Sequence, residues 1–546
     1  MNLFNCLLKK LSLALAICWL WTMIPLSNPV YAQKQPDIYQ LETTAKAYFD
    51  NYKYHLALPI FLTLNQLDPE ETEYRYAIAF CYLFLDKNEK ALPFFQLCLQ
   101  EPEKYPLQMM YYAARTYHLS GKYAYALKYY ELYKNYLSKD KKNFKNGLVA
   151  AAERDIKICE TAKELTSKPI DVKVINLGAI VNSEYPEYAP VVSADQSTLI
   201  FTSNRPNTTG GNVDGTDGNF FEDIYICYKM DTGWTAPEKM GDGINTIGHD
   251  ASISLSPDGN KLLLYRYEAQ TATASTSGDL YYSNLIGNAW MQAIKLPENI
   301  NSKSWEPSAS FSADEKTLLF TSDRKDGKGG TDIYMVKKLP NGEWALPQNM
   351  GDIINTPYDE DSPYLHPDGK TLYFSSNGHN TMGGFDIFMS RWDAAMQMWT
   401  IPTNVGYPIN TPHDDLHFSW SADGRRVYFP SVRPEGLGDR DLYYADINKE
   451  AAQVMLLKGT VTDSITHLPV SAKIFISDKP TNDILETVTS NSQTGKYLLL
   501  FNEGKGYRIE IQAEGYEPII EDINIEELHE FLETTRNFYL TKVSDK

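Results

Sequence analysis

The sequence predicts a multidomain protein that combines an α-helical repeat array with two all-β domains, a β-propeller and a β-sandwich. Three observations lead to this prediction. Apolar and aromatic residues recur at helical spacing in residues 36–168, a strand-rich motif recurs five times in residues 169–456, and short alternating strands fill residues 457–546. The chain has 546 residues, several times the usual length of one domain, so we expect several hydrophobic cores.

The charge of the chain is strongly acidic, with a formal net charge of −19. This balance argues against a nucleic-acid partner, which would favour a basic face. It identifies no partner by itself, because an acidic surface mostly reports solubility.

Residues 1–32 have the pattern of an export signal. Lys9 and Lys10 precede an apolar run over residues 11–24, and the small residues Val30 and Ala32 stand at the −3 and −1 positions of a cleavage site. We therefore expect a periplasmic protein of a Gram-negative bacterium, without a membrane span after cleavage. The alternatives are a retained single-span anchor and, less favoured because Ile17 precedes Cys18, a lipoprotein signal.

Four cysteines remain after the predicted cleavage: Cys81, Cys98, Cys159 and Cys227. Their spacing contains no C-x-x-C pair, so we expect no zinc site and no other cofactor. Buried free thiols are the favoured interpretation, although export permits disulfides.

Residues 36–168 contain an internal helical repeat. The alanines Ala57, Ala91 and Ala126 occupy matching positions that lie 34 and 35 residues apart. The pattern resembles the tetratricopeptide family, in which a small residue lets two helices pack closely. We expect three helix pairs and a terminal helix over residues 150–165. The resemblance implies a concave face that binds peptides or proteins. Six tyrosines could line it or simply pack between helices: Tyr74, Tyr76, Tyr111, Tyr112, Tyr129 and Tyr130.

Residues 169–456 carry five copies of a hairpin motif. Each copy has a turn aspartate followed by a β-rich run, an acid eight residues earlier, and a later Asp-hydrophobic-aromatic triplet. The turn aspartates are Asp195, Asp258, Asp314, Asp368 and Asp423. The preceding acids are Glu187, Asp250, Glu306, Glu360 and Asp415.

An Ile-Asn-Thr-like end closes four copies, and the fifth such end appears before the first turn, around Asn182. A circular array closes in this way when an N-terminal strand completes the last blade. We therefore predict a five-bladed β-propeller. Six blades are the alternative, if residues 453–457 and the N-terminal strand belong to separate blades.

The five copies resemble WD40-like repeats of the TolB type, known as PD40. The resemblance implies a protein-binding platform. Because the acids recur in every copy, we interpret them as structural residues of each blade rather than as metal ligands or catalytic groups.

Two weaker features of this region are candidate sites. Arg205, Arg324 and Arg433 follow the second strand of three copies and could face one rim as binding residues. The insertion 210–223 holds an oxygen-rich set that is either a solvated loop, the favoured interpretation, or a Ca²⁺ site without EF-hand spacing. This set is Asp214, Asp217, Asn219, Glu222 and Asp223.

Residues 457–546 contain alternating strands separated by Gly and Asn-Ser turns, such as Lys458 to Asp463 and Thr494 to Leu500. They resemble the carboxypeptidase regulatory-like domain, a transthyretin-like sandwich. The resemblance implies a structural or adhesive module without an active site.

The order of these regions resembles that of PorE-like and OmpA-family PD40 proteins of the Bacteroidetes envelope, which are associated with type IX secretion. Those proteins continue into a peptidoglycan-binding OmpA-like domain, whereas this sequence ends at Lys546, so cell-wall anchoring is not carried over. We expect a non-enzymatic scaffold that binds envelope proteins through the helical groove and the propeller face. A peptidoglycan-anchored protein could be among its partners, and an association with the outer membrane is part of this expectation.

The second hypothesis is a glycan- or peptide-binding propeller, or a hydrolase that uses the propeller channel. No catalytic residue is predicted, because G-x-S-x-G is absent and Glu533 replaces the second histidine of H-E-x-x-H after His529. A hydrolase would need a carboxylate pair whose geometry the sequence does not show.

Overall fold

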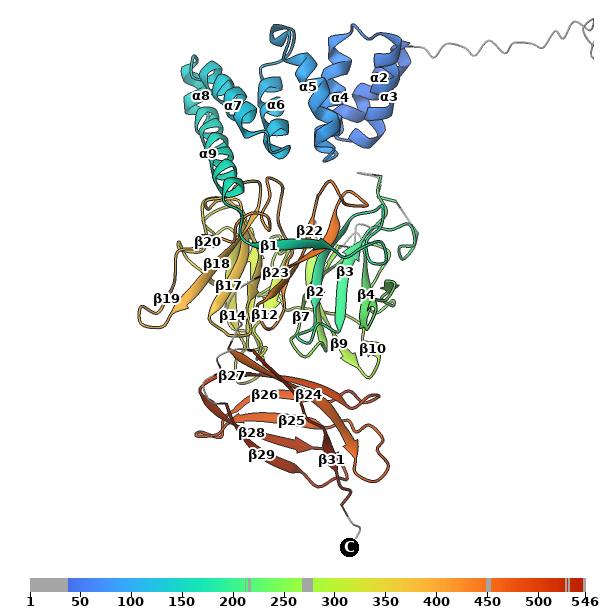
Figure 1. The fold of residues 1–546 in the computed structure, drawn as a ribbon, viewed down its shortest axis with the longest axis vertical. Coiled ribbons are helices and arrows are strands. Elements are labelled where there is room, and N and C mark those ends of the chain that lie inside the picture. The colour runs from blue at the N-terminus through green and yellow to red at the C-terminus, as the bar shows by residue number, and fades with distance from the viewer. Residues whose placement is uncertain are drawn as a thin grey trace, which may run out of the picture.

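The computed structural model describes residues 38–211, 213–214, 218–267, 278–447, 453–525, 528 and 531–543. The predicted export signal, residues 1–32, lies outside the described residues. Figure 1 shows three layers along the long axis of the molecule: a helical array at one end, a group of sheets in the middle, and the C-terminal sheets at the other end.

The helical array is built from consecutive helices that pack against their sequence neighbours. Ala57, Ala91 and Ala126 are fully buried, as expected of the small residues that let paired helices approach. Tyr74 and Tyr130 are buried, whereas the other predicted groove tyrosines are half-buried. The helices are α2 (Ile38–Asp50), α3 (Tyr54–Leu67), α4 (Thr72–Phe84), α5 (Asn88–Cys98), η1 (Pro102–Lys104), α6 (Gln108–Leu119), α7 (Tyr123–Leu137), α8 (Lys141–Lys145) and α9 (Leu148–Ser167).

Five antiparallel sheets follow, which we number sheet 1 to sheet 5 in the order of their first strands. Sheet 1 holds β2 (Glu187–Val192), β3 (Thr198–Ser203), β4 (Asp223–Met230), β5 (Gly233–Trp234) and β6 (Glu238–Lys239). Sheet 2 holds β7 (His249–Leu255), β8 (Lys261–Tyr267), β9 (Asp279–Ile286), β10 (Ala289–Trp290) and β11 (Ile294–Lys295). Sheet 3 holds β12 (Ala309–Phe311), β13 (Thr317–Ser322), β14 (Asp332–Lys337) and β15 (Gln348–Asn349).

Sheet 4 holds β16 (Glu360–Leu365), β17 (Thr371–Ser376), β18 (Asp386–Asp393), β19 (Met398–Trp399) and β20 (Thr403–Asn404). Sheet 5 holds β21 (Ser419–Trp420), β22 (Arg426–Ser431), β23 (Asp441–Ile447) and, from the start of the region, β1 (Val172–Asn176). The predicted hairpin strands after the turn aspartates are thus present in every sheet.

The first strands of the five sheets follow one another around a closed ring. β2 contacts β7, β7 contacts β12, β12 contacts β16, and β2 contacts β21. The last neighbours are joined by the Tyr364 hydroxyl, which donates to the Trp420 carbonyl (3.2 Å). β1 pairs with β23, with Ile175 opposite Tyr444, so the N-terminal strand completes the last sheet.

The C-terminal region packs two sheets around one core that includes Leu457, Ile474 and Phe501. One sheet holds β24 (Val454–Asp463), β27 (Lys496–Asn502), β30 (Leu532–Thr535) and β31 (Phe538–Leu540). The other holds β25 (Lys473–Asp478), β26 (Ile484–Thr489), β28 (Lys505–Gln512) and β29 (Ile519–Ile525). β24 begins at Val454, so it spans the boundary predicted between residues 456 and 457.

The C-terminal sheets pack against one face of the ring. Leu456 and Leu498 pack against Ala194 and Ala422, the alanines beside two of the turn aspartates. Within the described residues, none of the helices combines the length and the apolar character that crossing a membrane requires. The four described cysteines are buried free thiols, as the sequence suggested.

Candidate functional site

The repeated acids are buried and hold the loop that precedes each first strand. Glu306 is fully buried; its carboxylate accepts from the Ser302 N–H (3.2 Å), the Ser302 hydroxyl (2.7 Å) and the Ser322 hydroxyl (2.7 Å). The corresponding acids accept from the Ser or Thr four residues earlier in the same way: Glu187, Asp250, Glu360 and Asp415. These carboxylates are therefore engaged in the architecture of each sheet.

The repeated asparagines connect each of these loops to the neighbouring sheet. The Asn301 amide donates to the Leu280 carbonyl (2.9 Å), and its oxygen accepts from the Leu280 N–H (2.8 Å). Asn182 makes the same pair of bonds with Leu442, far away in the sequence. The displaced motif of the sequence thus closes the ring through side-chain hydrogen bonds as well as through β1.

The predicted rim arginines point into their own sheets. The Arg324 guanidinium donates to the Ile300 carbonyl (3.0 Å) and pairs with Glu306 (3.3 Å), and the Arg324 side chain is 15% exposed. Arg205 makes equivalent contacts with Val181 and Glu187, and Arg433 donates to the Pro408 carbonyl (2.6 Å). The binding role of these three arginines stays a prediction.

Two further residues occupy the same place in the remaining sheets. Arg266 donates to the Ile244 carbonyl (2.6 Å) and pairs with Asp250 (2.6 Å). In sheet 4, His379 Nε2 contacts the Ile354 carbonyl (2.8 Å). The sequence comparison of copies missed Arg266 because it lies within the second strand, β8, whereas the other three arginines follow theirs.

Burial raises the pKa of several repeated acids. The pKa of Glu360 rises to about 6, that of Asp223 to about 6 and that of Asp386 to about 7. In each case loss of hydration is the largest cause, and donated hydrogen bonds oppose it. Shifts of this kind reflect burial in the sheets.

The acids of the oxygen-rich insertion, residues 210–223, contact different partners. His249 contacts Glu222 through Nδ1 and Asp214 through Nε2 (3.2 Å), whereas Asp223 accepts from the Thr209 N–H (2.6 Å). Asp217 lies outside the described residues. Across the part of the chain that the structure describes, no grouping of His, Cys, Asp or Glu side chains could hold a metal ion. The Ca²⁺ alternative stays a prediction.

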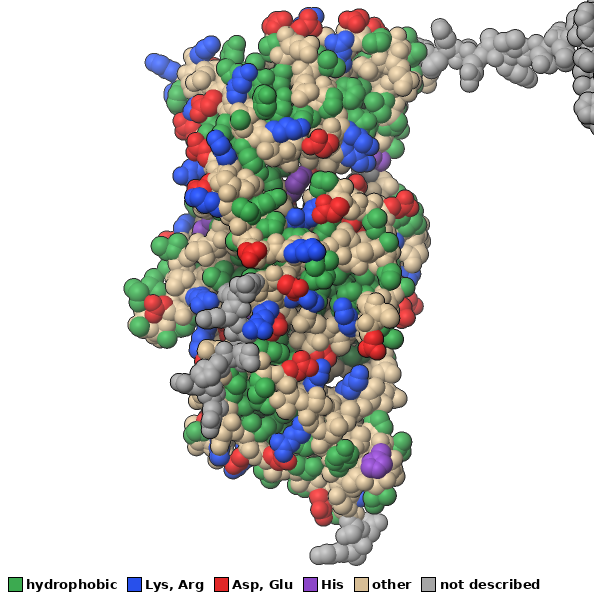
Figure 2. Space-filling view, viewed as in Figure 1, with side chains coloured by type: hydrophobic (Ala, Val, Ile, Leu, Met, Phe, Trp, Pro, Cys, Tyr) green, Lys and Arg blue, Asp and Glu red, His purple; other side chains and the backbone are tan. Residues whose placement is uncertain are grey.

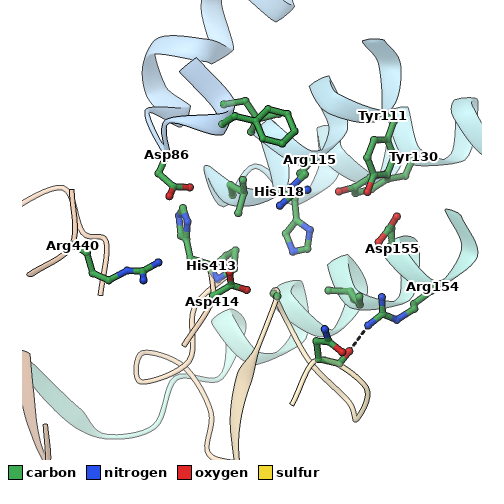
Figure 3. A pocket seen from close by; sticks show the side chains of 18 residues that line it. Asp86, Tyr111, Arg115, His118, Tyr130, Arg154, Asp155, His413, Asp414 and Arg440 are labelled. Carbon is green, nitrogen blue, oxygen red and sulfur yellow. Dashed lines mark hydrogen bonds between the residues drawn. The ribbon is translucent and has the colours of Figure 1, made fainter. Parts of the chain in front are cut away.

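A cleft of about 420 Å³ lies between the helical array and the ring of sheets. Its upper wall comes from α4, α6, α7 and α9, and its lower wall from the loops of sheets 4 and 5. Figure 3 shows Asp86 and His413 facing each other across it, with Arg440 beside them and Arg115 above. In the space-filling view, gaps are visible between the array and the sheets (Figure 2).

A second cavity of about 930 Å³ continues the cleft beneath the loops that follow α4 and α6. Both cavities share Asp86, Leu119, Pro412 and His413 in their linings. Together they form a passage between the array and the ring, with Asp86 and His413 where the two cavities meet.

The cations of the cleft and the acid Asp86 lack ion-pair partners among the described residues. Among the described residues, Arg115 and Arg440 form no ion pair, and Arg154 lies on the Tyr358 ring (3.9 Å to the centroid) with only the Asn377 carbonyl as acceptor. By contrast, Asp414 accepts from the Phe385 N–H (3.0 Å).

Asp155 and His413 are among the cleft residues whose pKa values are shifted. Burial raises the pKa of Asp155, which shares a hydrogen bond with the Tyr111 hydroxyl. Burial lowers the pKa of His413; Arg440 and Arg115 act in the same direction, and Asp86 and Asp414 oppose them. Both shifts favour the uncharged forms of these two groups.

The array contacts the ring on both sides of this passage. On one side, His118 Nε2 contacts the Met382 carbonyl (3.0 Å), and the Thr161 hydroxyl donates to Asn380 (3.1 Å). On the other, a Cβ at Gly218 would lie 2.2 Å from His55 Nε2, so the insertion of sheet 1 touches α3. The array therefore forms an arch over the ring.

The centre of the ring carries a second polar group. Ser362 Oγ contacts His417 Nδ1 (3.3 Å), and the Ser308 hydroxyl donates to Asp361 (2.5 Å). Ser362 and His417 have left-handed backbone conformations, with φ of 50° and 55°. Toward the C-terminal sheets the channel narrows to a cavity of about 30 Å³ lined by residues such as Phe311 and Trp420.

Sequence reasoning predicted neither the cleft nor its charged residues. Arg115, Asp155 and Arg440 stand on segments far apart in the sequence, and none of them recurs at the matching position of another copy. Of the tyrosines proposed for a groove, Tyr111 and Tyr130 line the cleft. A charged residue that occurs in only one copy of a repeat does not indicate a binding site in the sequence. It does so only when the fold brings several such residues together.

No family model matches the chain. No curated protein matches it either. Among solved structures, PcrH in complex with the chaperone binding region of PopD is similar at 19% identity and a TM-score of 0.20, covering 23% of this chain and 92% of that one. A complex of BT0996 and RGII has 10% identity and a TM-score of 0.35, covering 53% and 94%. An α-L-arabinofuranosidase from Lactobacillus brevis has 12% identity and a TM-score of 0.33, covering 49% and 91%. Scores this low assign neither a family nor an activity.

Proposed function

We propose that the chain is a non-enzymatic protein-binding scaffold whose main binding surface is the passage between the array and the ring. One observation carries this proposal: the residues that recur are hydrogen-bonded within and between the sheets of the ring, whereas charges without an ion pair, such as Arg115 and Arg440, converge on the passage from two domains. A scaffold needs this kind of open, charged surface and no reacting group.

The finer description of the fold belongs to the same proposal. We infer that the array is tetratricopeptide-like, the ring is a five-bladed PD40 propeller, and the C-terminal sheets form a transthyretin-like, carboxypeptidase regulatory-like sandwich. The pairing of β1 with β23 supports five blades. So does the pairing of β24 with β27 in the C-terminal sheets, because a sixth blade would need β24.

The cellular setting is proposed from the sequence. An export signal and the resemblance to PorE-like envelope proteins favour a periplasmic protein near the outer membrane. It would then be a component or accessory of a type IX-like secretion or gliding machine, with envelope proteins as partners. A peptidoglycan-anchored partner would supply the cell-wall attachment.

In-cell cross-linking of the tagged full-length chain, followed by mass spectrometry, tests this function. We expect cross-linked pairs between envelope proteins and residues around the passage, such as Lys87 and Lys90. The proposal fails if the chain cross-links only to itself and its deletion leaves secretion unchanged.

A second candidate function uses the channel as a glycan- or peptide-binding site, or as a hydrolase site. The observation that favours it is the contact of Ser362 with His417 next to Asp361 on the ring axis. Turnover of a glycan or peptide panel that is lost in Asp361→Asn and His417→Gln, while both variants keep the unfolding midpoint of the unaltered protein, would favour this candidate. Absence of turnover with the unaltered protein would count against the hydrolase form.

A further inference from the structure

The passage also indicates the class of partner. Resting on the proposed function, we propose that it binds an extended acidic peptide segment, whose carboxylates are held by Arg115 and Arg440. Both guanidiniums face the cleft and neither forms an ion pair within the described residues.

Arg115 and Arg440 need acceptors that the described part of the chain does not supply as ion pairs. A guanidinium offers several N–H donors in a planar fork and accepts nothing, and carboxylates match that fork with paired hydrogen bonds. Asp414 bonds to the Phe385 N–H and Asp155 to Tyr111, and Asp86 is the one acid of the cleft whose side chain has no hydrogen bond or ion pair within the described residues. The missing partners of Arg115 and Arg440 are therefore acceptors, which a ligand must bring.

The second cavity of the passage also carries cations. Lys87 and Lys90 line the second cavity, and within the described residues neither forms an ion pair. Most of the chain is acidic, with a net charge of −19, so an acidic segment would be repelled elsewhere. Glu89 and Asp439 line the same cavity, and Glu89 pairs with Lys122 (3.8 Å), so cations without an ion pair outnumber acids without one among the described lining residues.

The shape of the passage favours an extended ligand. The two cavities join at Asp86 and His413, so the site is elongated. Aromatic side chains continue the wall along the array: Phe84 is 41% exposed, its ring stacks on Phe80 (4.4 Å between centroids), and Phe80 meets Tyr112 (4.6 Å). An extended peptide with apolar side chains between its acids would use both the cations and this aromatic wall.

Binding of two labelled peptides to the full-length protein tests the proposal. One is a fluorescein-labelled, C-terminally amidated peptide of alternating Glu and Phe, and the other has Gln in place of Glu. In fluorescence anisotropy at low salt we expect the Glu peptide to bind about tenfold more tightly, and the difference to shrink at high salt.

Matched variants locate the effect. Arg115→Gln/Arg440→Gln should remove most of the preference for the Glu peptide. Arg425→Gln should keep it, because Arg425 is an exposed arginine on a turn beside Ala422, at the opposite mouth of the ring. Arg115→Lys/Arg440→Lys retains the charge without the fork and should give an intermediate affinity.

Three results would overturn the inference: equal binding of the Glu and Gln peptides, an unchanged preference in the Arg115→Gln/Arg440→Gln protein, or preferential binding of a labelled oligogalacturonate, which would indicate an acidic glycan. Because the peptide comparison uses the unaltered protein, it holds even if a variant fails to fold. If envelope proteins still cross-link at the passage while the Glu peptide shows no preference, the scaffold function stands and this inference falls.

Discussion

At the scale of single residues, buried carboxylates determine how the sheets respond to pH. Asp386 is fully buried and accepts from the Met382 N–H (2.8 Å), the Gly383 N–H (3.2 Å) and the Asn404 amide (2.6 Å). Burial raises its pKa to about 7 despite these bonds. The group is therefore a structural acceptor that is costly to ionise.

We predict that Asp386 makes the protein less stable as pH rises. Between the unfolded pKa of about 3.9 and the folded value of about 7, the folded protein keeps a proton that the unfolded chain has released, so stability falls over this window. Asp386→Asn should flatten that fall, even if it lowers stability near pH 5. Urea midpoints across this range measure it. The exposed Asp242→Asn is the control, and equal slopes in both variants would contradict the prediction.

At this scale the sequence predicted the structural role of the repeated acids better than it predicted which residues line a binding site. The fivefold recurrence of Glu306 and its equivalents indicated a structural role, and their hydrogen bonds agree with it. The rim position proposed for Arg324 rested on its place after a strand, but the spacing of residues does not show which way a side chain points. Arg115 and Arg440 gave no signal, because their proximity depends on how two domains dock.

At the scale of elements, closure of the ring depends on β1, an edge strand supplied from outside the repeats. Val172 and Val174 pack against the sheet 5 cluster around Tyr443. The strand was predictable because the displaced Asn182 motif has no partner within its own copy. The start of β24 at Val454 was less predictable, because an apolar run that links two β-domains reads equally well as the end of one or the start of the next.

Two proline variants of β1 distinguish the loss of a backbone hydrogen bond to β23 from the loss of a side chain. The Leu177 N–H donates to the Leu442 carbonyl, and ladder donors alternate, so the Ile175 N–H points to β23 and the Val174 N–H points away. Ile175→Pro should destabilise the protein by about 1–3 kcal/mol more than Val174→Pro. Chemical denaturation measures the difference. Equal losses would show that β1 does not hold the ring through this ladder.

At the scale of the whole molecule, the arch of helices makes the passage a defined site. Its attachment to sheet 4 includes His118, which is buried against the Met382 carbonyl and whose pKa is lowered to about 4 by that burial. The coarse architecture, helices followed by sheets, followed from hydrophobic periodicity. The arch did not, because the contact of His55 with Gly218 joins distant segments.

Acidification should loosen this attachment. The unfolded pKa of a histidine is about 6.5, so between pH 6.5 and the folded value of about 4 the detached state binds a proton that the docked state excludes, and docking weakens as pH falls. His118→Gln keeps a donor for Met382 and should reduce this pH dependence. Hydrogen exchange of the loop around Met382 measures it, with the exposed His467→Gln as control. An unaltered pH dependence in His118→Gln would contradict the prediction.

The central claim is that partners bind in the passage between array and ring. The most direct test places a photo-crosslinking amino acid at Lys90, an exposed lining residue, and in a second protein at Lys145, an exposed residue of α8 outside both cavity linings. After irradiation in cells, the account predicts the same envelope proteins on Lys90 in repeated experiments and far less of them on Lys145. Equal labelling at both positions, or none at Lys90, would contradict it.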